Sequence, residues 1–255
     1  MTSRKIHLLA LAVALLFGMM ARTVCAGEVN AAVAANFAVP MEQIVALFQK
    51  ESGHTVKVSL GSSGKFYAQI KEGAPFDVFL AADEKNPKLL EQEGLAVASS
   101  HFVYALGKLV LWSAKPGFVD DKGSVLSKGS YNKLAYADPK LAPYGLAAQQ
   151  TLEQMGLWNT IQSKLVTGES IAQTYQFAAT GNAELAFIAL SQITKDGKVT
   201  EGSWWLVPSN LYNPIRQGAV LLSAAKDKAA AQAFFAFLKS EKAAAVIRGF
   251  GYELP

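Results

Sequence analysis

Short apolar runs alternate along this chain with segments of helical periodicity, and this alternation constrains the fold more than any other feature. Apolar residues recur at helical spacing from Phe37 to Phe48, and this pattern stops at Gly53. Strands separated by helices of about 10 to 15 residues pair in parallel through right-handed crossovers. The first half therefore predicts an α/β unit, with strands at 30–35, 56–60 and 76–83.

The same alternation restarts after residue 106. Four helical patterns are expected in this half, at 144–155, 170–180, 226–239 and 241–249, and the strands are expected at 108–114, 133–139, 164–167, 183–190, 204–208 and 218–224. These strands are too numerous for one small sheet, so the length favours two α/β lobes of roughly 100 residues each. We expect lobe 1 to comprise 27–106 plus 219–255, and lobe 2 to comprise 107–218.

The N-terminal segment has the pattern of a cleaved secretory signal. Arg4 and Lys5 precede an apolar stretch, and Val24-Cys25-Ala26 places small residues before Gly27. The alternative is a membrane anchor, but the apolar stretch is shorter than the roughly 20 residues that a spanning helix needs. We expect residues 1–26 to be removed.

Removal of this segment changes the composition in two ways that bear on function. Cys25 is the only cysteine, so the mature chain can form neither disulfides nor thiolate metal sites. The formal charge falls from +4 to 4 − 3 = +1, because Arg4, Lys5 and Arg22 are lost without any acidic residue. The mature chain has no cluster of basic residues, so nucleic acid is not an expected partner.

The residues that could catalyse a reaction do not form a recognisable set. His54 and His101 have no Asp, Glu or Cys at metal-ligand spacing, and no serine lies in a G-x-S-x-G turn. Asp77 and Asp83 flank one strand and could be imagined as a carboxylate pair. The simpler interpretation is that Asp83 caps the next helix and that Asp77 lies where the strand begins. The sequence therefore predicts no enzyme.

Small or polar residues recur where a predicted strand turns into a helix, at 34–37, 61–66, 137–145 and 167–170. In a parallel sheet such turns lie beyond the carboxyl ends of the strands, where open α/β folds bind ligands. Each turn presents free N–H groups and the positive end of a helix dipole, which suit an anion. Ordinary capping explains any one of these turns, but four of them across two lobes favour a shared anion site.

The segment GAPFDVFLAAD at 73–83, in its wider context at 31–85, resembles the periplasmic molybdate-binding proteins of ABC importers. The likeness continues through 134–158 to the closing 234–254, so it covers nearly the whole mature chain. The resemblance implies a two-lobed periplasmic binding protein fold (type II), in which each lobe is a mostly parallel sheet flanked by helices. It also implies a monomer in the periplasm that binds molybdate or tungstate without a cofactor and delivers it to a membrane permease.

The resemblance also implies a set of ligand-binding residues. Asn36 stands where the family has a serine, and its side-chain amide can still donate; Ser63 matches the serine of the Gly/Ser turn. The main-chain N–H groups of Tyr144 and Ile171 match two further contacts. Ala189 stands where many members have a tyrosine hydroxyl, and we expect the Tyr144 phenol to replace that donor.

Neutral donors suit this ligand, because molybdate is fully deprotonated near neutral pH and needs no acceptor from the protein. Phosphate keeps a proton that such a site would leave unpaired. Sulfate has the same charge and shape as molybdate, so its exclusion depends on the size of the cavity. A binding protein for sulfate or another tetrahedral oxyanion, and an exported enzyme that uses the cleft, remain the alternatives.

Overall fold

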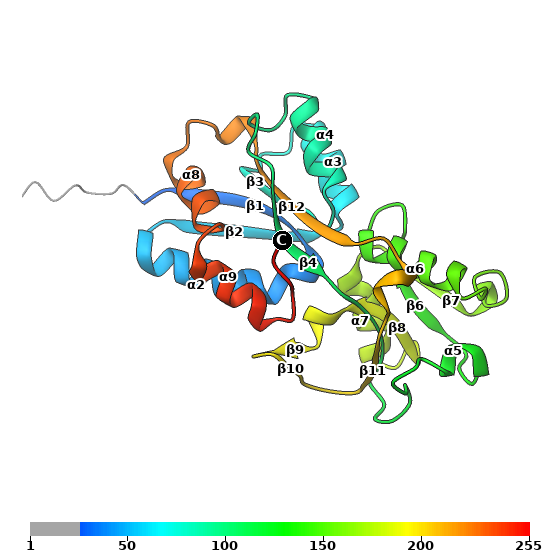
Figure 1. Ribbon diagram of the computed structural model, residues 1–255. Coiled ribbons are helices and arrows are strands. Elements are labelled where there is room, and N and C mark those ends of the chain that lie inside the picture. Colours follow the sequence, from blue (N-terminus) through cyan, green and yellow to red (C-terminus); the bar gives the residue numbers. More distant parts are fainter. Residues whose placement is uncertain (1–25) are drawn as a thin grey trace, which may run out of the picture.

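The computed structural model describes residues 26–255, which fold into two lobes (Figure 1). The expected signal segment, apart from Ala26, lies outside the described residues. Each lobe contains a five-stranded sheet with helices packed against it, so the prediction of a two-lobed α/β fold is confirmed.

The first sheet has the strand order β2-β1-β3-β12-β4. Its strands are β1 (Glu28–Ala34), β2 (Thr55–Gly61), β3 (Val78–Leu80), β4 (Phe102–Gly107) and β12 (Ile215–Leu221). Strand β1 pairs in parallel with β2 and β3, whereas β12 pairs antiparallel with β3 and β4. The parallel part of the sheet therefore directs the carboxyl ends of β1, β2 and β3 to one edge.

The second sheet has the order β11-β5-β8-β6-β7. Its strands are β5 (Leu109–Ser113), β6 (Leu134–Ala137), β7 (Leu165–Gly168), β8 (Leu185–Ala189) and β11 (Ser203–Leu206). Strand β6 pairs in parallel with β7 and β8, and β5 pairs antiparallel with β8 and β11. A separate two-stranded ribbon joins β9 (Thr194–Lys195) to β10 (Lys198–Val199).

The helices follow the strands as the periodicity indicates. Helix α2 (Ala38–Ser52) ends where predicted, at Gly53, whose left-handed φ of 72° suits a residue without a Cβ. The others are α3 (Ser63–Lys71), α4 (Lys85–Gln92), α5 (Val125–Lys128), α6 (Pro143–Gln154), α7 (Ile171–Ala179), α8 (Ala229–Phe237) and α9 (Glu241–Gly249). Short 3-10 turns are η1 (Ala35–Phe37), η2 (Gln162–Lys164), η3 (Leu190–Gln192), η4 (Ser209–Leu211) and η5 (Ser223–Ala225).

In each sheet four of the five strands run in one direction and one strand, β12 or β5, runs against them, so the prediction of mostly parallel sheets flanked by helices is confirmed. The antiparallel pairings come from the strands next to the crossings between the lobes, β4 and β12 in one sheet and β5 and β11 in the other. Strand β4 was not predicted, and β12 begins before the expected return at 219. The boundaries 27–106 plus 219–255 and 107–218 themselves stay a prediction.

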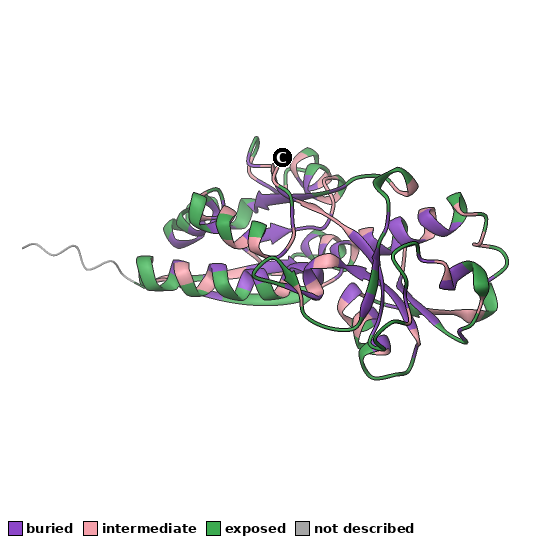
Figure 2. Ribbon diagram, turned by 60° about the horizontal axis from the view of Figure 1, so that its bottom comes forward, coloured by how far each residue is buried: buried purple, intermediate pink, exposed green. Residues whose placement is uncertain are grey.

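The core of the first lobe forms on both faces of its sheet, because successive side chains of a strand point to opposite sides. Ala31 and Val33 of β1 pack with α2, α8 and α9, whereas Ala32 between them packs against side chains of α3 and α4. Figure 2 shows that most strands are buried and that the outer faces of the helices are exposed; β2, at the edge of its sheet, is mostly exposed. The edge of the sheet at the carboxyl ends of β1 and β2 faces the other lobe.

Candidate oxyanion-binding site

A small cavity lies between the two lobes, at the carboxyl ends of β1 and β2. Its walls include Asn36, Ser62 and Ser63 of the first lobe and Tyr144 and Ile171 of the second. The structure thus brings all four predicted site residues to one small cavity.

The first lobe contributes hydroxyl groups from the turn between β2 and α3. The Ser63 Oγ accepts a hydrogen bond from the main-chain N–H of Ala82 at 2.9 Å, which leaves its own hydrogen free to donate. Ser63 is the first residue of α3, and its N–H has no acceptor among the described residues. Ser63 therefore offers two donors, in agreement with its predicted role.

The second lobe contributes main-chain N–H groups at the starts of two helices. Tyr144 follows Pro143 at the beginning of α6, and Ile171 is the first residue of α7. Neither N–H has an acceptor within residues 26–255, as expected for the first turn of a helix. The positive ends of α3, α6 and α7 converge on the cavity, which favours an anion there.

The side chain of Asn36 lies in the cavity wall, but its amide is used behind the cavity. Its Nδ2 donates to Gln217 Oε1 at 2.8 Å and to Tyr252 Oη at 2.9 Å, so both amide hydrogens have acceptors. The expectation that this amide donates to an anion has no support in this geometry, since one of these bonds would have to break first.

Tyr144 is also oriented away from its predicted use. Its phenol oxygen accepts a hydrogen bond from Gln217 Nε2 at 3.3 Å and lies against Gly107, where a Cβ would come within 2.2 Å of it. The main-chain N–H is what Tyr144 presents to the cavity. The structure thus gives no support to the idea that its phenol replaces a missing donor.

These side chains belong to a buried polar network between the lobes. Gln217 Oε1 accepts from Tyr104 Oη at 3.0 Å, and Tyr252 Oη donates to the Asn36 carbonyl at 2.9 Å and lies 2.8 Å from Ser191 Oγ. Burial raises the pKa of Tyr252 to about 12 and raises the pKa of Tyr104 and Tyr144 well above the usual value. The network is therefore uncharged at neutral pH.

Contacts between the lobes surround the cavity. The main-chain N–H of Gly64 in the first lobe donates to the Leu141 carbonyl in the second at 2.9 Å. Lys65 Nζ and Glu169 Oε2 form an exposed ion pair beside it, at 2.5 Å. A Cβ on Gly64 would lie 3.1 Å from Leu141 Cα, so glycine permits this close approach. These contacts define a closed arrangement of the lobes.

Comparison with known proteins identifies the family of this chain. A family of bacterial extracellular solute-binding proteins matches residues 29–253. The molybdate-binding protein ModA of Azotobacter vinelandii is 57% identical over 244 residues, covering 96% of this chain and 97% of its own, and ModA of Rhodobacter capsulatus is 53% identical, covering 95% and 94%. This chain belongs to the molybdate-binding protein family.

A solved structure titled as the periplasmic molybdate-binding protein of Azotobacter vinelandii superimposes with a TM-score of 0.87 at 44% identity, covering 89% of this chain and all of that one. The relatives in the molybdate-binding protein family are named as binding proteins. They confirm the prediction of a solute-binding protein and do not support the alternative of an exported enzyme.

Ala189 differs from the tyrosine that many members of the molybdate-binding protein family were expected to carry. It is fully buried at the end of β8, and its N–H donates to Gln192 Oε1 at 2.9 Å. Gln192 Nε2 in turn donates to the Ile171 carbonyl at 3.1 Å. Position 189 therefore helps to hold the start of α7, but it supplies no hydroxyl.

Ser62 is the cavity residue that the comparison with the molybdate-binding protein family missed. It lies at the N-cap of α3 and lines the cavity, and its Oγ is buried without a hydrogen-bond partner among the described residues. The sequence GSSG contained it, but nothing in two adjacent serines shows which one faces a ligand.

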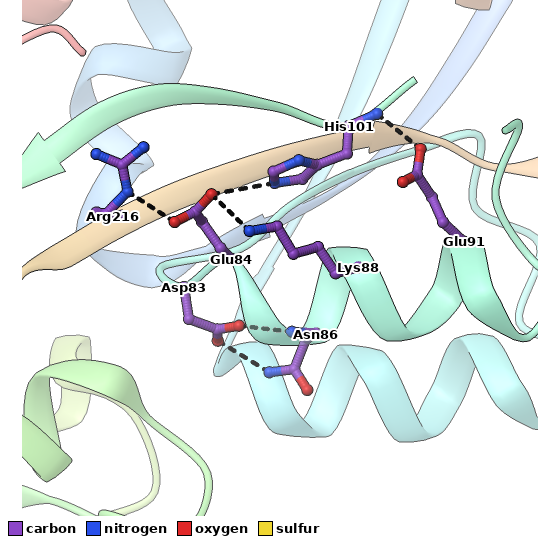
Figure 3. A network of polar contacts seen from close by, with 7 residues as sticks. All are labelled: Asp83, Glu84, Asn86, Lys88, Glu91, His101 and Arg216. Atoms are coloured by element: carbon purple, nitrogen blue, oxygen red, sulfur yellow. Dashed lines mark hydrogen bonds and ion pairs between the residues drawn. The ribbon is translucent and has the colours of Figure 1, made fainter. Parts of the chain in front are cut away.

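Asp77 and Asp83 have separate structural roles. Asp83 Oδ1 accepts from the main-chain N–H of Asn86 at 2.7 Å, as a capping group near the start of α4, and burial raises the pKa of Asp83 (Figure 3). Asp77 accepts from the main-chain N–H of Asn30 at 2.8 Å and pairs with Lys228 Nζ at 2.7 Å. They do not form a carboxylate pair.

The remaining charges of this region gather around Glu84, outside the cavity (Figure 3). Its carboxylate contacts Arg216 on β12 at 2.7 Å and Lys88 at 3.0 Å, and lies 3.9 Å from His101 Nε2. Burial opposes ionisation of Glu84, but the hydrogen bonds from Arg216 and Lys88 outweigh it and lower its pKa. Glu84 therefore ties β12 to the start of α4.

Within residues 26–255, no group of three or more His, Cys, Asp or Glu side chains could hold a metal ion. In the same range, no helix combines the length and the apolar character needed to cross a membrane.

Proposed function

We propose that this protein binds molybdate, or tungstate, in the cavity between the lobes and delivers it to the permease of an ABC importer. The observation that carries the proposal is the donor set: the Ser63 hydroxyl and the N–H groups of Ser63, Tyr144 and Ile171 all lack acceptors around one small cavity. The molybdate-binding proteins of two other bacteria share more than half of their aligned residues with this chain.

The strength of such a site is sufficient for capture at low concentration. Hydrogen bonds to a charged partner contribute roughly 1.5–3 kcal/mol each, so four of them give about 6–12 kcal/mol before the cost of association. The three converging helix starts add to this attraction. After an association cost of at least about 4 kcal/mol, the upper end of this range corresponds to a dissociation constant near micromolar.

The same donor set explains the expected selectivity. None of the described residues that line the cavity carries a formal charge. The wall therefore has N–H and O–H donors but no carboxylate that could accept a hydrogen bond. We expect a protonated oxyanion such as phosphate to bind less well, because its O–H would meet only weaker acceptors such as serine hydroxyl oxygens instead of a carboxylate. Discrimination between molybdate and sulfate rests on cavity size.

Export completes the proposed role. We expect the signal segment 1–26 to be removed, so that the mature chain begins at Gly27 and acts as a monomer in the periplasm. N-terminal sequencing of the protein recovered from that compartment checks the first point, and sedimentation of the mature chain checks the second.

The central test is isothermal titration of the mature, anion-free protein with molybdate, tungstate, sulfate and phosphate in turn. We expect tight 1:1 binding of the first two and no heat from the others. Equal binding of sulfate would leave an oxyanion-binding protein with a different physiological ligand. If none of the four anions bound, the proposal would be contradicted.

A further inference from the structure

Ser62 carries a buried hydroxyl that the protein itself leaves unused. The residue is only 5% exposed, it lines the cavity between the lobes, and its Oγ has no hydrogen-bond partner among residues 26–255. Buried hydroxyl groups are normally satisfied, because an unmade hydrogen bond costs stability. An unsatisfied hydroxyl in the wall of a binding cavity therefore requires an explanation.

Helix capping, the usual role of a serine at this position, does not provide one. Ser62 is the N-cap of α3, but its side chain accepts no N–H from the helix. Ser170 and Ser240, the N-caps of α7 and α9, do cap: their Oγ atoms accept from the N–H groups of Gln173 and Ala243, both at 3.3 Å. The Ser62 hydroxyl is thus available for something outside the helix.

We infer that the Ser62 hydroxyl donates a hydrogen bond to the bound oxyanion, so that Ser62 and Ser63 act as a pair of adjacent hydroxyl donors. This inference rests on the proposed function. The hydroxyl lacks an acceptor, and every oxygen of a deprotonated tetrahedral oxyanion is an acceptor. Binding would satisfy the group that the free protein leaves unpaired.

The two serines differ in how firmly they are held. The Ser63 Oγ accepts from the N–H of Ala82, and this bond fixes the position of the oxygen atom. The Ser62 hydroxyl has no such bond and can rotate toward an anion oxygen as the lobes close. Ser62 would therefore contribute mainly to retention of the anion once it is enclosed, and its loss should be seen in the dissociation rate.

The test compares Ser62→Ala with Ser170→Ala, a serine at the N-cap of the helix that faces the same cavity from the other lobe. Loss of one hydrogen bond to an anion should raise the dissociation constant for molybdate in Ser62→Ala by about 10- to 100-fold, with a faster dissociation rate. Its melting temperature without anion should not fall, because no bond is lost. Ser170→Ala should melt at a lower temperature but bind within about threefold of wild type, since it removes a cap.

The outcomes separate this inference from the proposed function. If wild type binds molybdate and Ser62→Ala binds within twofold of it, the inference is wrong and the proposed function stands. If wild type does not bind molybdate, the proposed function fails and the inference with it. A crystal structure of the wild-type molybdate complex provides an independent check. We expect a distance near 2.7 Å between Ser62 Oγ and an oxygen of the anion. If every anion oxygen lies more than 3.5 Å from Ser62 Oγ, the inference is wrong.

Discussion

The two lobes face the same cavity with different kinds of donor. The first lobe presents hydroxyl side chains together with the Ser63 N–H, on the turn before α3 and at its start, whereas the second presents the main-chain N–H groups of Tyr144 and Ile171. The side chain of Ile171 is apolar, and the Tyr144 phenol is engaged with Gln217. A side-chain donor can be lost by one substitution, but a main-chain donor persists as long as the helix starts at the same residue.

This contrast predicts the largest loss of affinity in the first lobe, for Ser63→Ala. The substitution removes one donor to the anion and leaves the N–H of Ala82 without its acceptor. We expect the dissociation constant for molybdate to rise by about 100-fold and the melting temperature to fall by about 2–4 °C. Titration calorimetry and thermal unfolding measure the two effects.

Ser59→Ala is the matched control, because Ser59 lies exposed on the neighbouring strand β2. It should change neither quantity. Wild-type affinity in Ser63→Ala would remove the proposed difference between the lobes.

The next effect tests how closely the lobes approach each other. In Gly64→Ala the new Cβ would lie 3.1 Å from Leu141 Cα and 3.2 Å from its carbonyl oxygen, so the lobes must shift by a few tenths of an ångström. We expect about 10-fold weaker molybdate binding, because the donors of the second lobe move away from the anion. Calorimetry detects this loss.

Gly249→Ala serves as the control for glycine replacement, since a Cβ there meets nothing within 4 Å. Unchanged affinity in Gly64→Ala would mean that the lobes adjust without cost.

Tyr144→Phe should weaken molybdate binding by less than about threefold, because the donor from Tyr144 is its main-chain N–H. The variant should instead be less stable, since Gln217 Nε2 loses its acceptor in a buried site. A drop of about 2–8 °C in melting temperature corresponds to the roughly 1–3 kcal/mol cost of such a group. A loss of affinity above 10-fold would show that the phenol does donate to the anion.

The smallest effect is expected at the ion pair between Lys65 and Glu169. Both side chains are well exposed, at 45% and 72%, so water and salt screen their attraction. Lys65→Ala should change the dissociation constant by no more than about twofold, and added salt should have equally little effect on wild type. A double-mutant cycle with Glu169→Ala that gave a tenfold coupling would contradict this expectation.

The sequence predicted the lobes and the edge of the sheet where the cavity lies, because both follow from the periodicity of the elements. Ser63 and the helix starts at Tyr144 and Ile171 were predicted from the resemblance to the molybdate-binding proteins. The antiparallel pairing of β12 with β3 and β4 was not predictable in the same way, since it joins segments more than one hundred residues apart.

The orientation of the polar side chains in the cavity wall could not be predicted from the sequence either. Asn36 and Tyr144 have the right chemistry to donate to an anion, but Gln217, far along the chain, engages both of them. Conversely, the sequence does not distinguish Ser62 from Ser63, and it is the fold that leaves the Ser62 hydroxyl without a partner among the described residues. Which acceptor each donor binds depends on the groups that the fold places next to it.

The hydrogen bond from the Gly64 N–H to the Leu141 carbonyl joins main-chain atoms of opposite lobes, so it exists only while the lobes are together. An amide hydrogen exchanges with solvent deuterium when its bond opens. The Gly64 amide is therefore a built-in reporter of how often the empty protein opens, one that needs no label and alters no residue.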